Sequence, residues 1–419
     1  MSVSIRDVRL PDGRISSVHL EGNRIDEIGR AREADVTIDG RGKALIPGLV
    51  NTHTHAAMTL LRGYADDLPL TDWLSTKIWP AEARLTAEAV YWGTKLACLE
   101  MVKSGTTSFN DMYFHMDAAA KAVAEMGIRG VLSEGFIDMF DAQRADKELR
   151  TARDVFRRIE AMRNPRLVPA LGPHAVYTVS EPSLRELDRI AQERDCLVHI
   201  HVAETAAEVD GVKKDRGTTP VGYLERLGLL GPHVVAAHGC WLGEDDVRVL
   251  GQRGVSVAHC PVSNMKLATG RVMPLAALRA AGVTIGLGTD GAASNNSLDM
   301  FHTMKVTALL HKFAGNTPTV AAAGEVLELA TAGGAKALRL DAGAIEVGKL
   351  ADLVLLDLHR PELTPTHHLV SNVVYAATGD CVDTVVCDGH VVMDHRRVPG
   401  EAEILEKAAA WAATLAGAT

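Results

Sequence analysis

Short apolar runs alternate with longer amphipathic stretches through the middle of this 419-residue chain, and this alternation limits the folds that the chain can adopt. Runs rich in Val, Ile and Ala are typical of buried parallel strands, and stretches such as PSLRELDRIAQERD between them are typical of helices. Eight such strands joined by helices predict a closed (β/α)8 TIM-like barrel. The candidate strands are ALIPGLVNTHTH, TTSFNDM, RGVLSEGFID, LVPALGPHA, LVHIHVAE, VVAAHGCWL, VSVAHCPVSN and VTIGLGTDG.

The two ends of the chain have a different pattern, in which short alternating strands are separated by turn residues. SSVHLEGNRIDEIG near the start has this pattern, and LADLVLLDL and DTVVCDGHVVMD repeat it near the end. We therefore expect a composite β-sandwich domain built from residues 1–48 and 347–419, including a C-terminal helix. Residues 49–346 form the expected catalytic barrel, and the stretch 56–105 is expected to place extra helices or a loop over its mouth.

Composition and charge narrow the class of protein. Hydrophobic residues make up 47% of the chain and charged residues 23%, values typical of a folded soluble protein. The net charge of −9 disfavours nucleic acid and anionic membranes as partners. No run approaches the ~18 apolar residues of a membrane-spanning helix, so a cytoplasmic location is expected. The 6 cysteines have no CxxC spacing and are expected to be reduced, buried thiols.

Polar side chains stand at the carboxyl ends of several predicted strands, where the active sites of such barrels form. His53 and His55 are two positions apart in an extended segment, so both imidazoles point to the same side and can bind one metal ion. One such histidine alone is as often structural, but a convergence from several strands favours a site. The further groups, on the fifth, sixth and eighth strands, are His201, Glu204, His238 and Asp290.

The kinds of side chain predict one divalent ion. Imidazoles with one carboxylate suit zinc or iron(II) and leave a position for water. A second ion is not expected, because the fourth strand, LVPALGPH, offers no lysine or carboxylate to bridge two ions. Of the remaining histidines, His259 is expected to make a hydrogen bond near the ion and His199 to pack deeper in the barrel. No convergent partner is predicted for His302, His311, His367 and His368.

Several segments together resemble the amidohydrolase superfamily, and within it the branch of 5-methylthioadenosine/S-adenosylhomocysteine deaminases. The segments are PGLVNTHTH, the HVAE that ends in Glu204, AAHG, CPVSNMKL and GLGTDGAASNNSLDM. The resemblance covers nearly the whole chain. It implies a barrel with a small β domain, a small-molecule nucleoside substrate and a homo-oligomer. The metal ligands that it implies are His53, His55, His201 and Asp290.

The activity implied by the resemblance is hydrolysis of an adenine nucleoside to its hypoxanthine analogue and ammonia. Glu204 would carry a proton from the attacking water to ring N1, and His238 would hold and polarise that water. Asp290 would pass the remaining proton to the departing amine. One alternative is a related hydrolase of another heterocycle, such as a triazine or guanine, although a glutamate matched to a ring nitrogen favours deamination. A non-catalytic scaffold is the other alternative, which the complete ligand set disfavours.

The resemblance also implies substrate-binding residues. Glu82 would accept hydrogen bonds from ribose hydroxyls, although an exposed glutamate is the commoner case. The sequence departs from the family pattern at Glu134. The resembled enzymes commonly have an arginine at this position that binds the distal part of the substrate. The Glu134 carboxylate would repel the carboxylate of S-adenosylhomocysteine, although Arg144 could take the place of the missing arginine. Adenosine, 5′-deoxyadenosine and methylthioadenosine therefore stay open as substrates. The full expected set is Trp73, Glu82, Arg144, His174, Glu204, Asp290 and Ser294.

Overall fold

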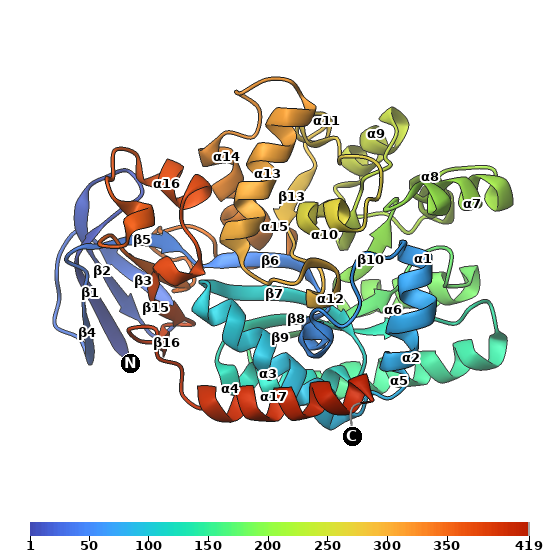
Figure 1. Cartoon of the computed structure of the whole chain (residues 1–419), viewed down its shortest axis with the longest axis horizontal. Coiled ribbons are helices and arrows are strands. Elements are labelled where there is room, and N and C mark those ends of the chain that lie inside the picture. The colour runs from blue at the N-terminus through green and yellow to red at the C-terminus, as the bar shows by residue number, and fades with distance from the viewer. Residues whose placement is uncertain (418–419) are drawn as a thin grey trace.

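The computed structural model describes residues 1–417 and contains two eight-stranded sheets (Figure 1). In the central sheet every strand is parallel to its neighbours, and the strands follow one another in chain order. This arrangement confirms the expected barrel of eight strands. The strands are β6 (Leu49–Thr54), β7 (Thr106–Tyr113), β8 (Arg129–Phe136), β9 (Leu167–Pro173), β10 (Val198–Val202), β11 (Val234–His238), β12 (Ser256–His259) and β13 (Thr284–Leu287).

The barrel closes where its last strand, β13, meets its first strand, β6. The Thr52 hydroxyl donates to the Leu287 carbonyl oxygen at 2.9 Å, and the Asp290 N–H donates to the His53 carbonyl oxygen at 2.9 Å. Close approach at this seam needs a glycine, since a Cβ on Gly286 would lie 2.3 Å from Cγ2 of Thr52. The seam therefore brings two segments more than 200 residues apart side by side.

Helices surround the barrel, and their starts agree with capping chemistry. The side chains of Thr86, Asp141 and Thr205 each accept a backbone N–H in the first turn of the helix that follows. These outer helices are α3 (Ala87–Lys103), α4 (Met116–Met126), α5 (Ala142–Ala161), α6 (Glu181–Arg194), α7 (Ala206–Arg216), α8 (Pro220–Leu227), α9 (Glu244–Arg253), α11 (Leu275–Ala280), α13 (Met300–Ala314), α14 (Ala323–Glu328) and α15 (Gly334–Ala337).

Short helices follow three of the strands close to the barrel mouth. The stretch after β6 holds α1 (Leu70–Trp73) and α2 (Trp79–Glu82), as expected for extra helices in this region. After β12 and β13 come α10 (Pro261–Lys266) and α12 (Ala292–Asn295). No helix among the described residues is long and apolar enough to cross a membrane. All six cysteines are unpaired and buried, as predicted.

The second sheet combines both ends of the chain and lies beside the barrel (Figure 1). Its order is β16-β15-β14-β5-β1-β2-β3, and β4 pairs with β1. The composite β domain is therefore confirmed, while its proposed limits at residues 48 and 347 stay a prediction. The strands are β1 (Ser2–Arg9), β2 (Ile15–Glu21), β3 (Arg24–Ile28), β4 (Val36–Asp39), β5 (Lys43–Pro47), β14 (Leu353–Asp357), β15 (Val382–Cys387) and β16 (His390–Met393).

The segment ALIPGLVNTHTH, expected as one strand, is divided between the two sheets. Its first half, β5, pairs with β14, and its second half, β6, begins the barrel. The chain changes sheets at Gly48, which lies so close to β7 that a Cβ would be 2.2 Å from the Thr107 hydroxyl. The single-strand prediction was wrong because the apolar run continues across this change of sheet.

Two further helices, α16 (Leu369–Tyr375) and α17 (Glu401–Ala416), belong to the C-terminal part of the chain. Helix α17 runs along α3 of the barrel (Figure 1). The Lys103 ammonium lies 2.7 Å from Glu401 Oε1, and the Arg84 guanidinium donates to the Leu415 carbonyl oxygen. The helix that we grouped with the β domain thus packs on the barrel.

A buried ion network joins the barrel to the β domain. Arg129, at the start of β8, contacts Asp352 Oδ2 at 2.7 Å and Asp388 Oδ1 at 2.5 Å. Arg166 also approaches Asp388, at 3.4 Å. The side chains of Arg129 and both aspartates are at most 8% exposed, so their charges depend on one another for compensation.

Replacing Arg129 by Met should destabilise the protein by about 3–5 kcal/mol, because two buried carboxylates would lose their main counter-charge. The measurement is urea unfolding followed by circular dichroism. The control is Arg248→Met, whose exposed pair with Asp245 should leave the unfolding midpoint unchanged. An Arg129→Met midpoint equal to that of the unaltered protein would show that the network does not stabilise the fold.

Candidate metal centre and active site

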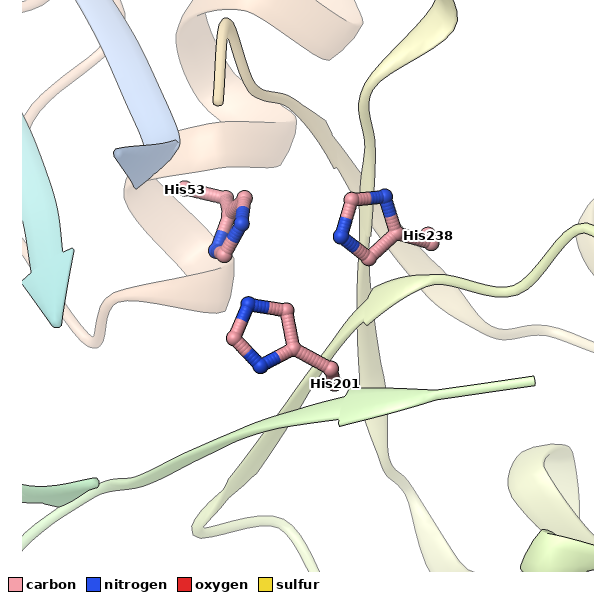
Figure 2. Close-up of side chains that lie close together, drawn as sticks. All are labelled: His53, His201 and His238. Atoms are coloured by element: carbon pink, nitrogen blue, oxygen red, sulfur yellow. The ribbon is translucent and has the colours of Figure 1, made fainter. Parts of the chain in front are cut away.

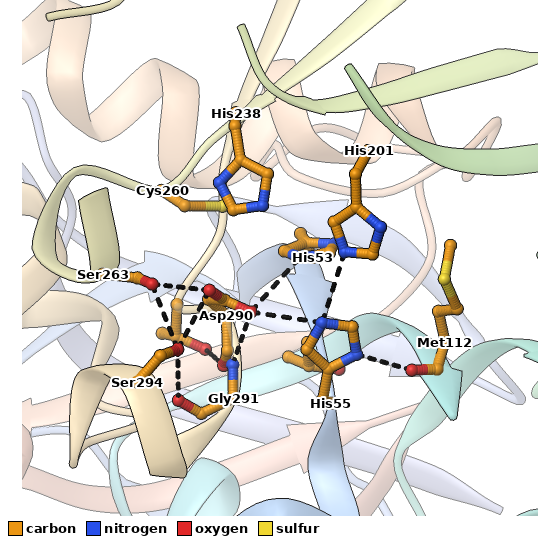
Figure 3. Close-up of polar contacts among 12 residues, drawn as sticks. His53, His55, Met112, His201, His238, Cys260, Ser263, Asp290, Gly291 and Ser294 are labelled. Carbon is orange, nitrogen blue, oxygen red and sulfur yellow. Dashed lines mark hydrogen bonds and ion pairs between the residues drawn. The ribbon is translucent and has the colours of Figure 1, made fainter. Parts of the chain in front are cut away.

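Imidazole and carboxylate groups converge at the carboxyl end of the barrel, around the seam between β6 and β13 (Figure 3). The Nε2 atoms of His53 and His55 each lie 3.3 Å from Asp290 Oδ1. His201 Nε2 lies 3.3 Å from His55 Nε2. Figure 2 shows His238 on the other side of the same space, facing His53 and His201. The structure thus brings together the residues that the sequence predicted as ligands.

The second ring nitrogen of each predicted histidine ligand has its own partner. Nδ1 of His55 lies 2.6 Å from the Met112 carbonyl oxygen, and Nδ1 of His201 lies 2.7 Å from the His174 carbonyl oxygen. His53 Nδ1 lies 2.7 Å from His199 Nε2. Such contacts orient a ring so that its Nε2 points at a metal ion.

His199 and His311 have contacts that the sequence analysis did not predict. His199 is buried, as expected, but it also holds the ring of His53 and therefore does more than pack. The expectation that His311 has no partner was wrong, since its Nε2 lies 3.0 Å from Nε2 of His259. His259 makes this contact through Nε2, whereas its Nδ1 has no partner among the described residues. The two rings come from β12 and α13, an encounter that only the folded chain reveals.

The donor set fits a divalent cation. Burial lowers the pKa of His53 to about 4, so its ring is neutral, and its buried Nε2 faces Asp290 Oδ1 at 3.3 Å. Burial alone would raise the pKa of Asp290, but the surrounding imidazoles, His53 first among them, hold it well below its usual range. Neutral imidazole nitrogens beside an ionised carboxylate are the ligands that zinc prefers.

Asp290 is held by the turn that follows β13. The Ser263 hydroxyl donates to Asp290 Oδ2 at 2.5 Å, the Ser294 hydroxyl donates to the same atom at 3.0 Å, and the Gly291 N–H donates to Oδ1 at 2.8 Å (Figure 3). Oδ1 faces the histidines and Oδ2 faces the serines. Ser294 borders the pocket as expected, and its hydroxyl contacts Asp290, Ser263 and the Gly291 carbonyl oxygen. The sequence analysis did not identify Ser263.

Glu204 and His238 face each other beside the histidines. Glu204 Oε2 lies 3.8 Å from His238 Nε2. Burial, and then the charge of Asp290, raise the pKa of Glu204 to about 8, so this carboxyl can hold a proton near neutral pH. Burial also lowers the pKa of His238 to about 4. A carboxyl group that can hold a proton near neutral pH is suited to carrying a proton between the attacking water and a substrate.

The backbone under Glu204 is fixed by Glu208, which the sequence analysis missed. Ala203 has φ +53°, an unfavourable value for a residue with a Cβ. Glu208 accepts the N–H groups of Ala203 and Glu204 at 2.9 and 2.8 Å. Because Glu208 lies four residues after Glu204, at the start of α7, a search for capping residues could have found it.

A pocket opens from these groups towards α1 and α2, and it contains most of the predicted substrate-binding residues. Trp73 and His174 line it, and the indole N–H of Trp73 donates to the Ala65 carbonyl oxygen at 2.9 Å. Glu82 also lines it and accepts the Tyr113 hydroxyl at 2.8 Å. Burial raises the pKa of Glu82 to about 7, so this residue is not the exposed glutamate of the commoner case.

Arg144 and Glu134 lie farther out, in a neighbouring compartment that shares Trp79, Glu82 and other walls with the pocket. Arg144 is exposed on the first turn of α5 and does not line the inner pocket. The Glu134 carboxylate accepts the backbone N–H groups of His115 and Met116 at 3.1 and 2.8 Å, at the start of α4. These contacts offset part of the repulsion that we expected between the Glu134 carboxylate and the carboxylate of S-adenosylhomocysteine.

Comparison with known proteins agrees with this geometry. The model of the Amidohydrolase family matches residues 44–392. The chain is 53% identical over 383 residues to a 5′-deoxyadenosine deaminase of Methanoregula boonei, covering 91% of this chain and 87% of that protein. It is 49% identical over 405 residues to 5-methylthioadenosine/S-adenosylhomocysteine deaminase 1 of Archaeoglobus fulgidus, covering 96% and 95%.

A solved structure is also similar over almost the full length. The crystal structure of an adenosine deaminase from Xanthomonas campestris with bound zinc superposes with a TM-score of 0.93 at 37% identity, covering 99% of this chain and 98% of that one. These matches confirm the resemblance that the sequence motifs indicated. The chain belongs to the amidohydrolase family.

Proposed function

We propose that this protein is a metal-dependent hydrolase that deaminates adenine nucleosides to their hypoxanthine analogues and ammonia. The observation that carries the proposal is the pair Glu204 and His238, 3.8 Å apart, at the edge of the His/Asp centre and inside the pocket that Glu82 also lines. The relatives named as 5′-deoxyadenosine and 5-methylthioadenosine/S-adenosylhomocysteine deaminases support the substrate class.

The proposed cofactor is one divalent ion, zinc or alternatively iron(II), held by His53, His55, His201 and Asp290. When bound, such an ion would lower the pKa of a water molecule enough to give a nucleophile near neutral pH. The neutral imidazoles and the ionised carboxylate described above support this ligand set. A single ion is supported by β9, whose residues include no lysine or carboxylate.

Proton transfer is assigned to three side chains of the pocket. Glu204 protonates N1 of the adenine ring, which makes C6 electrophilic, and its raised pKa supports this task. His238 orients the attacking water from the opposite side. Asp290 passes the remaining proton towards the departing amine, and the hydroxyls of Ser263 and Ser294 hold its carboxylate in place. Ammonia then leaves as a neutral molecule.

The nucleoside is placed by the walls of the pocket. Trp73 and His174 contact its base and sugar, and Glu82 accepts hydrogen bonds from the ribose hydroxyls. The 5′ substituent extends into the outer compartment, which Arg144 lines. We also propose that the protein is a cytoplasmic homo-oligomer, as the family resemblance implies, and that it binds neither nucleic acid nor membranes.

The test is ammonia release by the metal-analysed protein from adenosine, 5′-deoxyadenosine, methylthioadenosine, S-adenosylhomocysteine, guanine and a chlorotriazine. We expect turnover of the adenine nucleosides and none of the last two compounds. The ranking of the nucleosides reports how the outer compartment treats the 5′ substituent. Protein that contains metal yet releases no ammonia from any nucleoside would contradict the substrate class.

A further inference from the structure

Asn264 contacts His238 from behind the active site. It belongs to α10, and its amide nitrogen Nδ2 lies 3.0 Å from His238 Nδ1. The side chain is buried, and its backbone is tied on both sides: the Asn264 N–H donates to the Cys260 carbonyl oxygen, and the Thr269 N–H donates to the Asn264 carbonyl oxygen, both at 3.0 Å. The backbone position of Asn264 is therefore fixed, and Nδ2 is the amide atom that contacts the imidazole, while Oδ1 has no hydrogen-bond partner among the described residues.

The partners of the other rings determine where their protons reside. Nδ1 of His55 and Nδ1 of His201 each face a backbone carbonyl oxygen, which can only accept a hydrogen bond. A neutral imidazole carries one N–H, so in both rings Nδ1 is protonated and Nε2 keeps its lone pair. This is the tautomer that binds a metal ion through Nε2.

His238 has the opposite kind of partner. Position alone does not separate it from the ligands, because one nitrogen each of His53, His201 and His238 lie within 4.8 Å of one another (Figure 2). The Asn264 amide nitrogen, however, can only donate, so Nδ1 of His238 must hold the lone pair. Nε2 then carries the proton and faces Glu204 Oε2, an acceptor, at 3.8 Å.

We infer that Asn264 is a positioning residue that fixes His238 in the tautomer protonated at Nε2, so that His238 donates a hydrogen bond in the active site and is not a metal ligand. This inference rests on the proposed function for the role of that hydrogen bond, but the tautomer itself does not depend on any substrate. Helix α10 then positions two groups at once, because the adjacent Ser263 holds Asp290 Oδ2.

Two substitutions of Asn264 give opposite results under the two tautomers. In Asn264→Asp the new carboxylate can only accept, so Nδ1 of His238 becomes protonated, and a ring that stays neutral loses its Nε2 proton. We expect kcat to fall by about 10–100-fold with little change in KM, at least as far as in Asn264→Ala. Asn264→Asp more active than Asn264→Ala would overturn the inference, because it would show that His238 donates to residue 264.

A second readout needs no substrate. After cobalt(II) replaces the native ion, the visible spectrum reports the number of ligands. We expect Asn264→Asp to gain an imidazole ligand from His238 and to show a weaker spectrum with six ligands instead of five, whereas Asn264→Ala resembles the unaltered protein. Identical spectra for all three proteins would count against the inference. These spectra keep their meaning even if no nucleoside is deaminated, so the two proposals fail separately.

The control for an amide-to-acid exchange is Asn372→Asp in α16, where Nδ2 donates to the Pro365 carbonyl oxygen at 2.9 Å. Its activity and cobalt spectrum should stay unchanged. If Asn264→Asp does not fold, zinc-loaded protein with ¹⁵N-labelled histidine gives the answer, with the His238 signals assigned by their loss in His238→Gln. A protonated Nε2 supports the inference, and a protonated Nδ1 overturns it.

Discussion

Glu204→Gln should lower kcat by about 10³-fold while the protein keeps its full complement of metal. The amide has nearly the size of the acid, but it cannot release a proton to the ring nitrogen or take one from the attacking water. Glu204 is buried and contacts none of the predicted ligands through a hydrogen bond, so the metal centre should be unaffected. Steady-state kinetics with metal analysis of the same sample make the measurement.

The matched control is Glu225→Gln, at an exposed pair with Arg253 on the outside of the barrel. This variant should have the kcat of the unaltered protein. The KM of Glu204→Gln should change much less than its kcat, because the pocket walls stay in place. A Glu204→Gln protein with kcat close to normal would remove Glu204 from the proton-transfer path.

Removal of the metal ion by a chelator should abolish turnover, and addition of zinc should restore it. Without the ion no water molecule is acidic enough to attack at neutral pH. The apo protein should also be less stable, by about 4 kcal/mol when the holo sample contains free zinc at ~1,000 times its Kd. Ammonia release and thermal unfolding before and after dialysis against the chelator are the measurements.

Glu204→Gln also serves as the control for this experiment. Its thermal midpoint should fall on chelation by as much as that of the unaltered protein, since the ligands are the same. Full activity in a sample shown to be free of metal would contradict the metal-dependent mechanism. If chelation destabilises both proteins equally while only the unaltered protein is active with its ion, the role of the ion is distinguished from the role of Glu204.

The barrel and the convergence of candidate metal-binding side chains at one end of it could be predicted from the sequence because both depend on local patterns. Period-two and apolar runs mark strands, and parallel strands place residues such as His53 and Asp290 at the same end. The division into two strands at Gly48 could not be predicted, because an apolar run has the same pattern whether it belongs to one sheet or to two. The position of α17 depends on contacts with α3, distant in sequence, and no local pattern contains them.

The supporting residues around the site were the hardest to predict. His199, Ser263 and Asn264 act through hydrogen bonds to residues of other segments of the barrel, and each bond depends on a side-chain torsion and on the closed barrel. Serine and asparagine are also common where helices begin, so their residue type gives little guidance. Arg144 lines the outer compartment and not the inner pocket, so its role as a substrate-binding residue stays a prediction.

The seam between β6 and β13 has a consequence for how the protein is made. A chain emerging from the ribosome presents His53 early and His201 later, but Asp290 arrives only with the last barrel strand. Until that strand docks against the first, the nascent protein has imidazoles without their carboxylate. If the proposed ligand set holds the ion, high-affinity metal uptake would follow completion of the barrel and would mark molecules in which the last strand has docked.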